Sequence, residues 1–221
     1  MTQYYCTKTK LEEIANYLLR QFDAERLEIA KPIDVYAVIE KCLNVPYDWK
    51  IISPNRSVWG LTVFTPGYYW IWQKQDDNPG LIPEKMFFEQ GTIVIDSFLT
   101  EIPNRGPENF TVMHEVFHQI LHKDLFTETN GISQHEARKE SLPYSPEKEA
   151  WSTERSCEYQ ANFCAACFLM PRVPVTNMFR SLVPRGQYPV DTKSVEAEMA
   201  AAFSVSKKAM HNRLQTLELL Y

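Results

Sequence analysis

Two histidines and a glutamate share one short segment, His114-Glu115-Val116-Phe117-His118, which has the spacing H-E-x-x-H. On an α-helix, residues four positions apart lie about 40° apart around the axis and about 6 Å apart along it, so both imidazoles can bind one Zn²⁺ ion. Glu115 is then close enough to accept a proton from water without binding the metal. The alternative is a helix with two hydrogen-bonded histidines; the apolar flanks of the motif favour the metal site.

A catalytic zinc site commonly has three protein ligands and one position for water, so a third ligand is expected downstream. Glu158 is the best candidate, because it shares a helix face with apolar residues, where an unpaired carboxylate is costly. Glu154, one turn earlier, is the second choice and suits a solvated face better. Asn162, one turn later, can accept the spare N–H of a ligand histidine. His122 is expected at the helix end, where it would interact with the helix dipole.

The five cysteines allow a second hypothesis for a metal site. Cys164 and Cys167 form a C-x-x-C pair, but it stands alone among alanine and phenylalanine in a predicted helix. Buried thiols that pack against a neighbouring helix are the favoured interpretation. An odd number of cysteines, in a chain without an export signal, indicates reduced thiols and no disulfide framework.

The elements that must position these residues are helices at both ends of the chain and strands between them. Helices are predicted from apolar spacing and end signals over 9–22, 32–43, 107–123, 145–170, 175–182, 194–202 and 207–217. Strands are predicted from β-branched and aromatic runs over 58–64, 69–72 and 92–95. Residues 135–144 are expected to form a loop or lid. The fold class is therefore α+β, with a small mixed or antiparallel sheet. We expect one domain over 1–172 and a C-terminal helical hairpin over 173–221 that docks on it.

The strand Thr92-Ile93-Val94-Ile95 is a candidate substrate-binding element. At a sheet edge, these residues would bind an extended peptide by strand addition and orient it across the metal. A paired strand inside the sheet is an equally good interpretation. The residue that stabilises the oxyanion is not identified by the sequence, with Tyr68, Tyr69 and His135 as candidates.

Composition narrows the class of protein. The 221 residues are 44% hydrophobic, 13% aromatic and 23% charged, which excludes wholesale disorder and coiled-coil classes. No apolar stretch approaches the roughly 20 residues that a membrane span needs, and the N-terminal residues do not resemble a signal peptide. We therefore expect a cytoplasmic protein without membrane contact. The net charge of −5 argues against nucleic-acid binding by the whole protein.

The C-terminal segment differs in charge, because residues 172–221 contain seven Lys or Arg and four Asp or Glu. Its two helices, a turn at 204–205 and Ser206 as N-cap resemble a DNA-reading helix-turn-helix. The second helix carries four basic or titratable residues: Lys207, Lys208, His211 and Arg213. Because the local charge is modest, a docked hairpin or a partner-binding surface is favoured over a DNA reader.

Taken together, residues 110–118 and 158–171 resemble the ImmA/IrrE family of zinc metallopeptidases. Residues 91–96 and 203–214 are also similar to that family. The segment between His118 and Glu158 is long for the family, and Val116-Phe117 replaces the small residues that commonly precede the second histidine.

The resemblance implies a zincin-like fold that binds one Zn²⁺ per chain. It implies His114, His118 and Glu158 as zinc ligands and Glu115 as general acid and base. Family members are bacterial, often linked to mobile elements or stress responses, and cleave or are thought to cleave a helix-turn-helix transcriptional repressor. The expected function is thus a zinc endopeptidase that acts on such a repressor. The alternative is a non-proteolytic or latent regulator with a structural zinc site, whose hairpin binds DNA or a protein.

Overall fold

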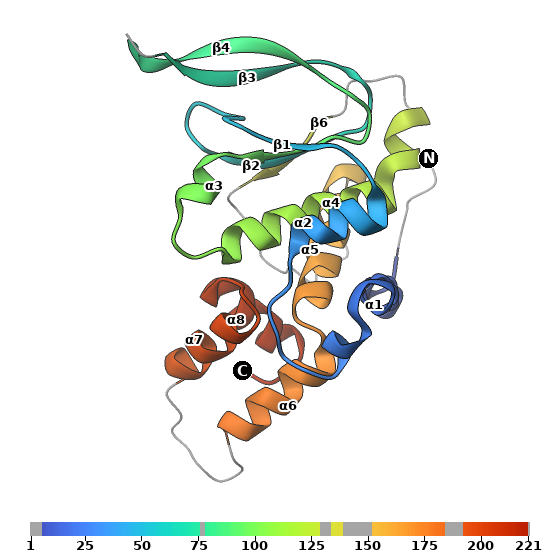
Figure 1. Cartoon of the computed structure of the whole chain (residues 1–221). Helices are drawn as coiled ribbons and strands as arrows, with labels where there is room; N and C mark the ends of the chain where they lie inside the picture. Colours follow the sequence, from blue (N-terminus) through green and yellow to red (C-terminus); the bar gives the residue numbers. More distant parts are fainter. Residues whose placement is uncertain (1–5, 76–77, 129–133, 139–151, 184–191, 221) are drawn as a thin grey trace.

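A computed structural model describes residues 6–75, 78–128, 134–138, 152–183 and 192–220. The strands gather at one end of the molecule, a layer of helices lies below them, and the C-terminal helices form the opposite end (Figure 1). The prediction of an α+β fold is confirmed.

Most of the helices correspond to predicted ranges, whereas the short helical segments at 24–27 and 98–101 were not predicted. The helices are α1 (Lys8–Asp23), α2 (Val35–Val38), α3 (Phe98–Glu101), α4 (Gly106–Glu128), α5 (Thr153–Leu169), α6 (Arg172–Leu182), α7 (Thr192–Ala202) and α8 (Lys207–Thr216), with the short helical turns η1 (Ala24–Leu27) and η2 (Ile39–Leu43). Side-chain caps explain several of the starts. Thr7, Ser152 and Ser206 each accept a hydrogen bond from the backbone N–H three residues later. The helix expected from residue 145 therefore begins at Thr153 in the described part of the chain.

The strands form two sheets. They are β1 (Tyr47–Lys50), β2 (Val58–Val63), β3 (Gly67–Gln75), β4 (Asn78–Phe88), β5 (Ile93–Asp96) and β6 (Gln134–Arg138). One sheet has the order β1-β5-β2-β6, with β1 and β5 parallel and the other pairs antiparallel; β3 and β4 form a separate two-stranded ribbon. Residues 134–138, of which 135–138 were expected to lie in a loop, are thus a strand.

Of the two interpretations of residues 92–95, the paired interior strand is confirmed and the edge strand is wrong. β5 lies between β1 and β2, so its backbone is paired on both sides. Thr92 is 4% exposed, and Ile93, Val94 and Ile95 are fully buried. A substrate strand cannot add to a backbone whose hydrogen bonds are already made.

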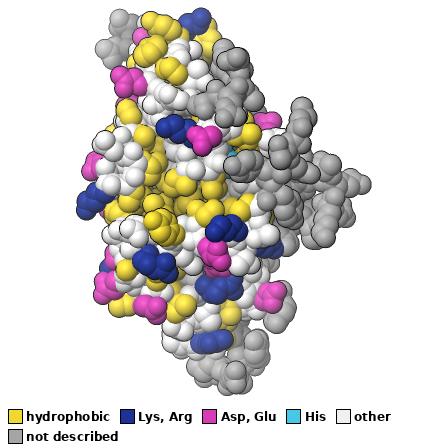
Figure 2. All heavy atoms as spheres, turned by 90° about the vertical axis from the view of Figure 1, so that its right-hand side faces the viewer, with side chains coloured by type: hydrophobic (Ala, Val, Ile, Leu, Met, Phe, Trp, Pro, Cys, Tyr) yellow, Lys and Arg dark blue, Asp and Glu magenta, His cyan; other side chains and the backbone are white. Residues whose placement is uncertain are grey.

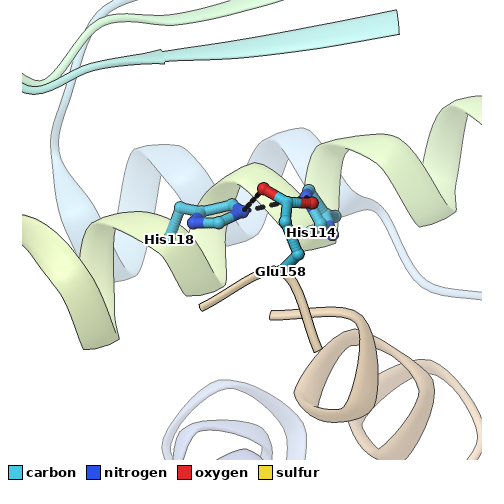
Figure 3. Close-up of side chains that lie close together, drawn as sticks. All are labelled: His114, His118 and Glu158. Carbon is cyan, nitrogen blue, oxygen red and sulfur yellow. Dashed lines mark hydrogen bonds and ion pairs between the residues drawn. The ribbon is translucent and has the colours of Figure 1, made fainter. Parts of the chain in front are cut away.

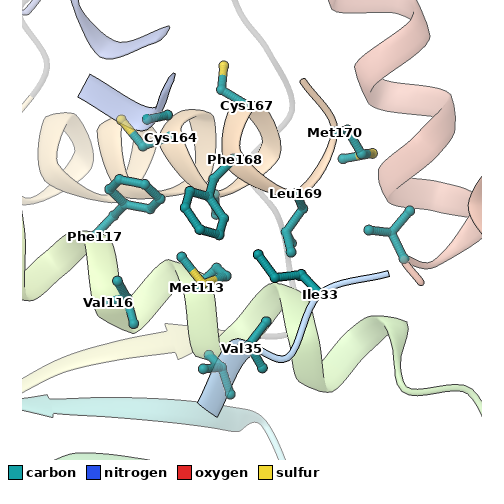
Figure 4. Packing of buried hydrophobic residues seen from close by; sticks show 14 of the residues in the cluster. Ile33, Val35, Met113, Val116, Phe117, Cys164, Cys167, Phe168, Leu169 and Met170 are labelled. Carbon is teal, nitrogen blue, oxygen red and sulfur yellow. The ribbon is translucent and has the colours of Figure 1, made fainter. Parts of the chain in front are cut away.

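The main hydrophobic core lies between α1, α4, α5 and the C-terminal helices. Met113 and Phe117 of α4 face Phe168 and Leu169 at the end of α5, whereas Val116 points away from α5 (Figure 4). The same cluster continues into the tail through residues of α7, α8 and their connection, namely Met199, Ala200, Phe203, Val205, Met210 and Leu214. The division at residue 172 remains a prediction, and the hydrophobic core extends across it.

A buried arginine attaches α8 to the rest of the molecule. Arg213, 1% exposed, donates from Nε to the carbonyl of Met170 at 2.9 Å and from Nη2 to Glu12 Oε1 at 3.1 Å. Arg172 binds the other oxygen of Glu12 at 2.7 Å. Arg213 is one of the four basic or titratable residues noted on this helix, and its burial agrees with the favoured interpretation of a docked hairpin. The side chain faces α1 and the end of α5.

The surface carries charges of both signs. On the face drawn in Figure 2, hydrophobic side chains gather across the middle of the molecule, and basic and acidic side chains are interspersed below them. Within the described ranges, no helix combines the length and the apolar character that crossing a membrane requires.

Candidate metal centre

Helix α4 brings the two histidines of the H-E-x-x-H motif to one face. His114 is 3% exposed and His118 is fully buried, and both imidazoles point toward α5 (Figure 3). Their Nε2 atoms lie 2.9 Å apart. The 3.6-residue period of the helix produces this pairing, as the sequence predicted.

Glu158 extends from α5 toward the same point. Its Oε2 lies 3.4 Å from His114 Nε2, and its Oε1 lies 3.2 Å from His118 Nε2. Glu154, the second choice, is exposed one turn earlier. Among the described residues, His114, His118 and Glu158 form the one group of three or more side chains with metal-ligand spacing.

The spacing of this triad fits a small divalent cation. Two ligand atoms, each about 2.1 Å from a tetrahedral ion, lie about 3.4 Å from each other. The three distances of 2.9, 3.2 and 3.4 Å are close to this value. Two imidazoles and a carboxylate suit Zn²⁺ and other first-row divalent metals. The residues present therefore fit a metal ion.

The lowered pKa of His118 agrees with this fit, whereas the pKa of His114 is raised by its carboxylate neighbours. Burial lowers the pKa of His118 well below its ordinary value, and the charge on His114 lowers it further. A neutral imidazole has a lone pair to give to a metal. Burial also acts to lower the pKa of His114, but the carboxylates of Glu158 and Glu115 outweigh it and raise the value. A bound cation would oppose that rise.

Asn162 lies where the sequence expected it, behind a histidine of the triad. Its Oδ1 is 3.1 Å from His114 Nδ1, and its Nδ2 donates to the backbone carbonyl of Glu158 at 2.9 Å. The second contact orients the amide so that its oxygen faces the histidine. His114 then keeps its proton on Nδ1, and its Nε2 lone pair is directed at the metal position.

His122 lies elsewhere than expected. It is fully buried in the interior of α4, because the helix continues to Glu128 and does not end at residue 123. Its Nδ1 is 3.0 Å from His118 Nδ1, and its Nε2 is 3.3 Å from Oε1 of Gln160 on α5. Gln160 was missed by the sequence analysis, because nothing in its local pattern distinguishes it from a packing residue.

Glu115 lies between α4 and strand β2. Its side chain is fully buried, and Oε2 accepts a hydrogen bond from the hydroxyl of Thr62 at 2.5 Å. Oε1 accepts no hydrogen bond from any residue that the structure describes. Burial raises the pKa of Glu115 to about 7, although the charge of His114 and the Thr62 hydrogen bond act in the opposite direction. A carboxyl group with a pKa near neutrality can both accept and release a proton.

Gly60 allows this close approach. A Cβ atom built on Gly60 would lie 2.5 Å from Oε1 of Glu115, closer than two such atoms can come. Gly60 and Thr62 were predicted only as strand residues, because their contact with α4 depends on how the sheet packs on the helix.

The other candidates from the sequence lie apart from the triad or outside the described side chains. Tyr69 is buried and donates its hydroxyl to the carbonyl of Thr65, and Tyr68 is 72% exposed. The side chain of His135 is outside the described part. Cys164 and Cys167 are free and fully buried, as expected, and burial raises the pKa of the Cys167 thiol to about 11.

Comparison with known protein families identifies the family of this chain. The family model of the IrrE N-terminal-like domain, a peptidase family, matches residues 98–215. The chain belongs to this family. The match covers α4, α5 and most of the C-terminal helices, and so includes every residue of the triad and Glu115. A search of curated proteins finds no match. Membership of the IrrE N-terminal-like family supports a metallopeptidase-like function and confirms the resemblance inferred from the motifs.

Proposed function

We propose that this protein is a zinc-dependent endopeptidase that binds one Zn²⁺ through His114, His118 and Glu158. The observation that carries the proposal is the convergence of these three side chains with the buried carboxylate of Glu115 beside them. A closed structural zinc site needs a fourth protein ligand and no base. The described part of the chain offers a base in Glu115 and no fourth ligand in the group.

The chemistry divides between the cation and the protein. When bound, a zinc ion supplies Lewis acidity, which polarises a peptide carbonyl and makes water a better nucleophile. Glu115 accepts a proton from the attacking water, whose oxygen forms a bond to the carbonyl carbon. Glu115 then donates that proton to the amide nitrogen as the C–N bond breaks. Thr62 occupies Oε2 of Glu115, so Oε1 remains available for proton transfer.

The proposed substrate is a protein regulator, a helix-turn-helix transcriptional repressor, and the resemblance to the ImmA/IrrE peptidases supports it. The same resemblance supports a role in transcription regulation associated with a mobile element.

Metal content and peptide cleavage, measured together, test the proposal. We expect one zinc per chain in the wild type and in Glu115→Gln, and much less in Glu158→Ala. Cleavage of a proteome-derived peptide library, followed by mass spectrometry, should fall by about 10²–10⁴-fold in Glu115→Gln. Glu154→Ala, an exposed carboxylate one turn from Glu158, is the matched control and should keep both zinc and cleavage. Undiminished cleavage by Glu115→Gln would overturn the assignment.

One observation supports a latent form of the same enzyme. Strand β6 pairs with the outer edge of β2, with Ala137 opposite Gly60 and His135 opposite Thr62, the two residues that contact Glu115. An extended substrate that added to this edge of β2 would compete with the chain's own strand. We therefore propose that residues 134–138 restrain the activity until they are displaced.

Removing one backbone donor of β6 tests this restraint. Ala137→Pro removes an N–H from the strand and should weaken its pairing with β2, so cleavage of the peptide library should rise several-fold with zinc content unchanged. Ala137→Ser keeps the N–H and is the control. Equal activity of the two variants would reject the restraint. Zinc binding without cleavage by any of these proteins would favour the non-proteolytic regulator.

The contacts of the C-terminal hairpin support its docking on the rest of the molecule and argue against DNA recognition. Arg213 is buried, and His211 lies 2.8 Å from Glu196 of α7. Lys207 and Lys208 remain exposed. A salt-dependent mobility shift of duplex DNA by the full chain, abolished in a Lys207→Ala/Lys208→Ala double variant, would reverse this preference.

A further inference from the structure

A line of buried polar contacts leads away from the triad, starting from the ring nitrogen of His118 that does not face Glu158. His118 Nδ1 lies 3.0 Å from His122 Nδ1, and His122 Nε2 lies 3.3 Å from Gln160 Oε1. His118 and His122 are fully buried, and Gln160 is 4% exposed. The line therefore joins a candidate metal ligand on α4 to a side chain on α5 without passing through solvent.

The chemistry of the three groups fixes where each proton lies. His118 presents Nε2 to Glu158 and His114, so a metal there requires the His118 proton on Nδ1. That N–H can donate only to a lone pair, which assigns Nδ1 of His122 as the acceptor and its proton to Nε2. The His122 Nε2–H in turn donates to the carbonyl oxygen of Gln160. The opposite arrangement would place a proton on His118 Nε2, where the metal must bind.

The two histidine ligands are thus held in the same tautomer by different means. Asn162 accepts the Nδ1–H of His114 directly. His118 uses an intermediate imidazole, and Gln160 supplies the final carbonyl. In each case an amide oxygen on α5 keeps the metal-facing nitrogen of an α4 histidine unprotonated.

The surroundings of His122 and Gln160 argue against a role in packing alone. Phe117 and Phe168 meet nearby in the same α4–α5 interface, at 6.0 Å between ring centroids, and the interface is otherwise largely apolar. Buried imidazole and amide groups are costly unless each is hydrogen-bonded, and apolar side chains would join the two helices at lower cost.

We propose that His122 and Gln160 are positioning residues that hold His118 in its metal-binding tautomer and thereby set the affinity for zinc. The inference rests on the proposed metal site and adds a determinant of its strength that lies outside the ligands. Neither residue contacts the reacting groups in this role.

Zinc affinity, measured by competition with a chromogenic chelator, tests the proposal. His122→Leu removes the acceptor and should weaken Zn²⁺ binding about 10–100-fold. His122→Asn places a carbonyl oxygen near the former Nδ1 and should recover most of that loss. Gln160→Leu should weaken binding by a smaller factor, and Gln160→Glu, which keeps an acceptor, should not.

Gln119→Leu is the matched control, because Gln119 is a buried polar residue of α4 whose amide donates to the carbonyl of Gly91 and not to this line. It should leave zinc affinity unchanged even where it lowers the melting temperature. In the zinc-loaded wild type, ¹⁵N-histidine NMR should show His118 protonated on Nδ1, and the signal of that proton should move in Gln160→Leu.

The outcomes separate this inference from the proposed function. Tight zinc binding by the wild type with equal affinity in His122→Leu and Gln160→Leu would overturn the positioning role alone. A His118 protonated on Nε2 in the loaded protein would do the same. Failure of the wild type to bind zinc would overturn the metal site and the positioning role together. If His122→Leu does not fold, the comparison of Gln160→Leu with Gln160→Glu tests the positioning role.

Discussion

Gly60 limits where the carboxylate of Glu115 can lie, because any side chain on β2 at this position would overlap Oε1. We expect Gly60→Ala to displace the carboxylate by part of an ångström and to lower peptide cleavage about 10–100-fold. Zinc content should stay at the wild-type level, because the three atoms nearest to a Cβ on Gly60 all belong to Glu115 and none to a metal ligand. Elemental analysis beside the cleavage assay measures both.

Gly67→Ala is the control for this substitution, because a Cβ atom there would meet its nearest neighbour, Tyr69, at an ordinary 3.9 Å. It should cleave like the wild type. Full activity of Gly60→Ala, with the same melting temperature, would show that Glu115 needs no such close placement.

At the scale of the elements, a buried cation links α8 to α1 and α5 beside the apolar contacts of Met210 and Leu214. Arg213 donates to the end of α5 and to Glu12 of α1, so its removal takes a buried donor from the Met170 carbonyl and leaves Glu12 with Arg172 alone. We expect Arg213→Leu to lower the free energy of unfolding by about 3 kcal/mol, measured by urea denaturation. Lys208→Ala, an exposed change on the same helix, should stay within about 0.5 kcal/mol of the wild type.

The same contact makes the attachment of α1 sensitive to acid. Burial acts to raise the pKa of Glu12, but hydrogen bonds and charges from Arg172 and Arg213 outweigh it, so the pKa lies below its ordinary value of 4.5. A carboxylate whose pKa is lowered by folding stabilises the protein fully above its unfolded pKa and loses this contribution as pH falls through the folded value.

We therefore expect the unfolding free energy of the wild type to fall between about pH 5 and pH 3 more steeply than that of Glu12→Gln. Urea denaturation across this range measures the difference. Glu13→Gln, an exposed residue that pairs with Lys10 at 3.2 Å, should keep the wild-type slope. Equal slopes for the wild type and Glu12→Gln would mean that Glu12 gains nothing from its arginines.

At the scale of the whole molecule, a metal ion would join α4 to α5 through the triad. A ligand that binds only the folded state stabilises it by about 2.7 kcal/mol at 100 times its dissociation constant. We expect EDTA to lower the melting temperature of the wild type and added Zn²⁺ to restore it. Glu158→Ala should respond much less to either. An equal response in that variant would place the stabilising ion elsewhere.

Much of the candidate site follows from the sequence, because its residues are related by helix geometry. Positions i and i+4 share a helix face whatever the rest of the fold does, so His114 and His118 could be paired from their spacing alone. Glu158 could be selected because a carboxylate among apolar neighbours needs a partner. The start of the last helix also follows from a local signal, the serine cap at residue 206.

Contacts between distant segments were decided by the tertiary structure. The sequence of β5 suits an edge or an interior strand equally well, and only the pairing with β1 and β2 placed it inside the sheet. The sequence does not distinguish Arg213 from the other basic residues of its helix, and only the contacts with α1 and α5 show that it is buried.

The sequence by itself therefore determined the ligand-bearing helices and the chemistry they can support. The tertiary structure decided that Gly60 borders Glu115 and that Gln160 faces His122. The physical reason is the separation along the chain over which each signal acts. Helix periodicity and capping act within a few residues, whereas the register between packed helices and strands depends on how all their side chains fit together.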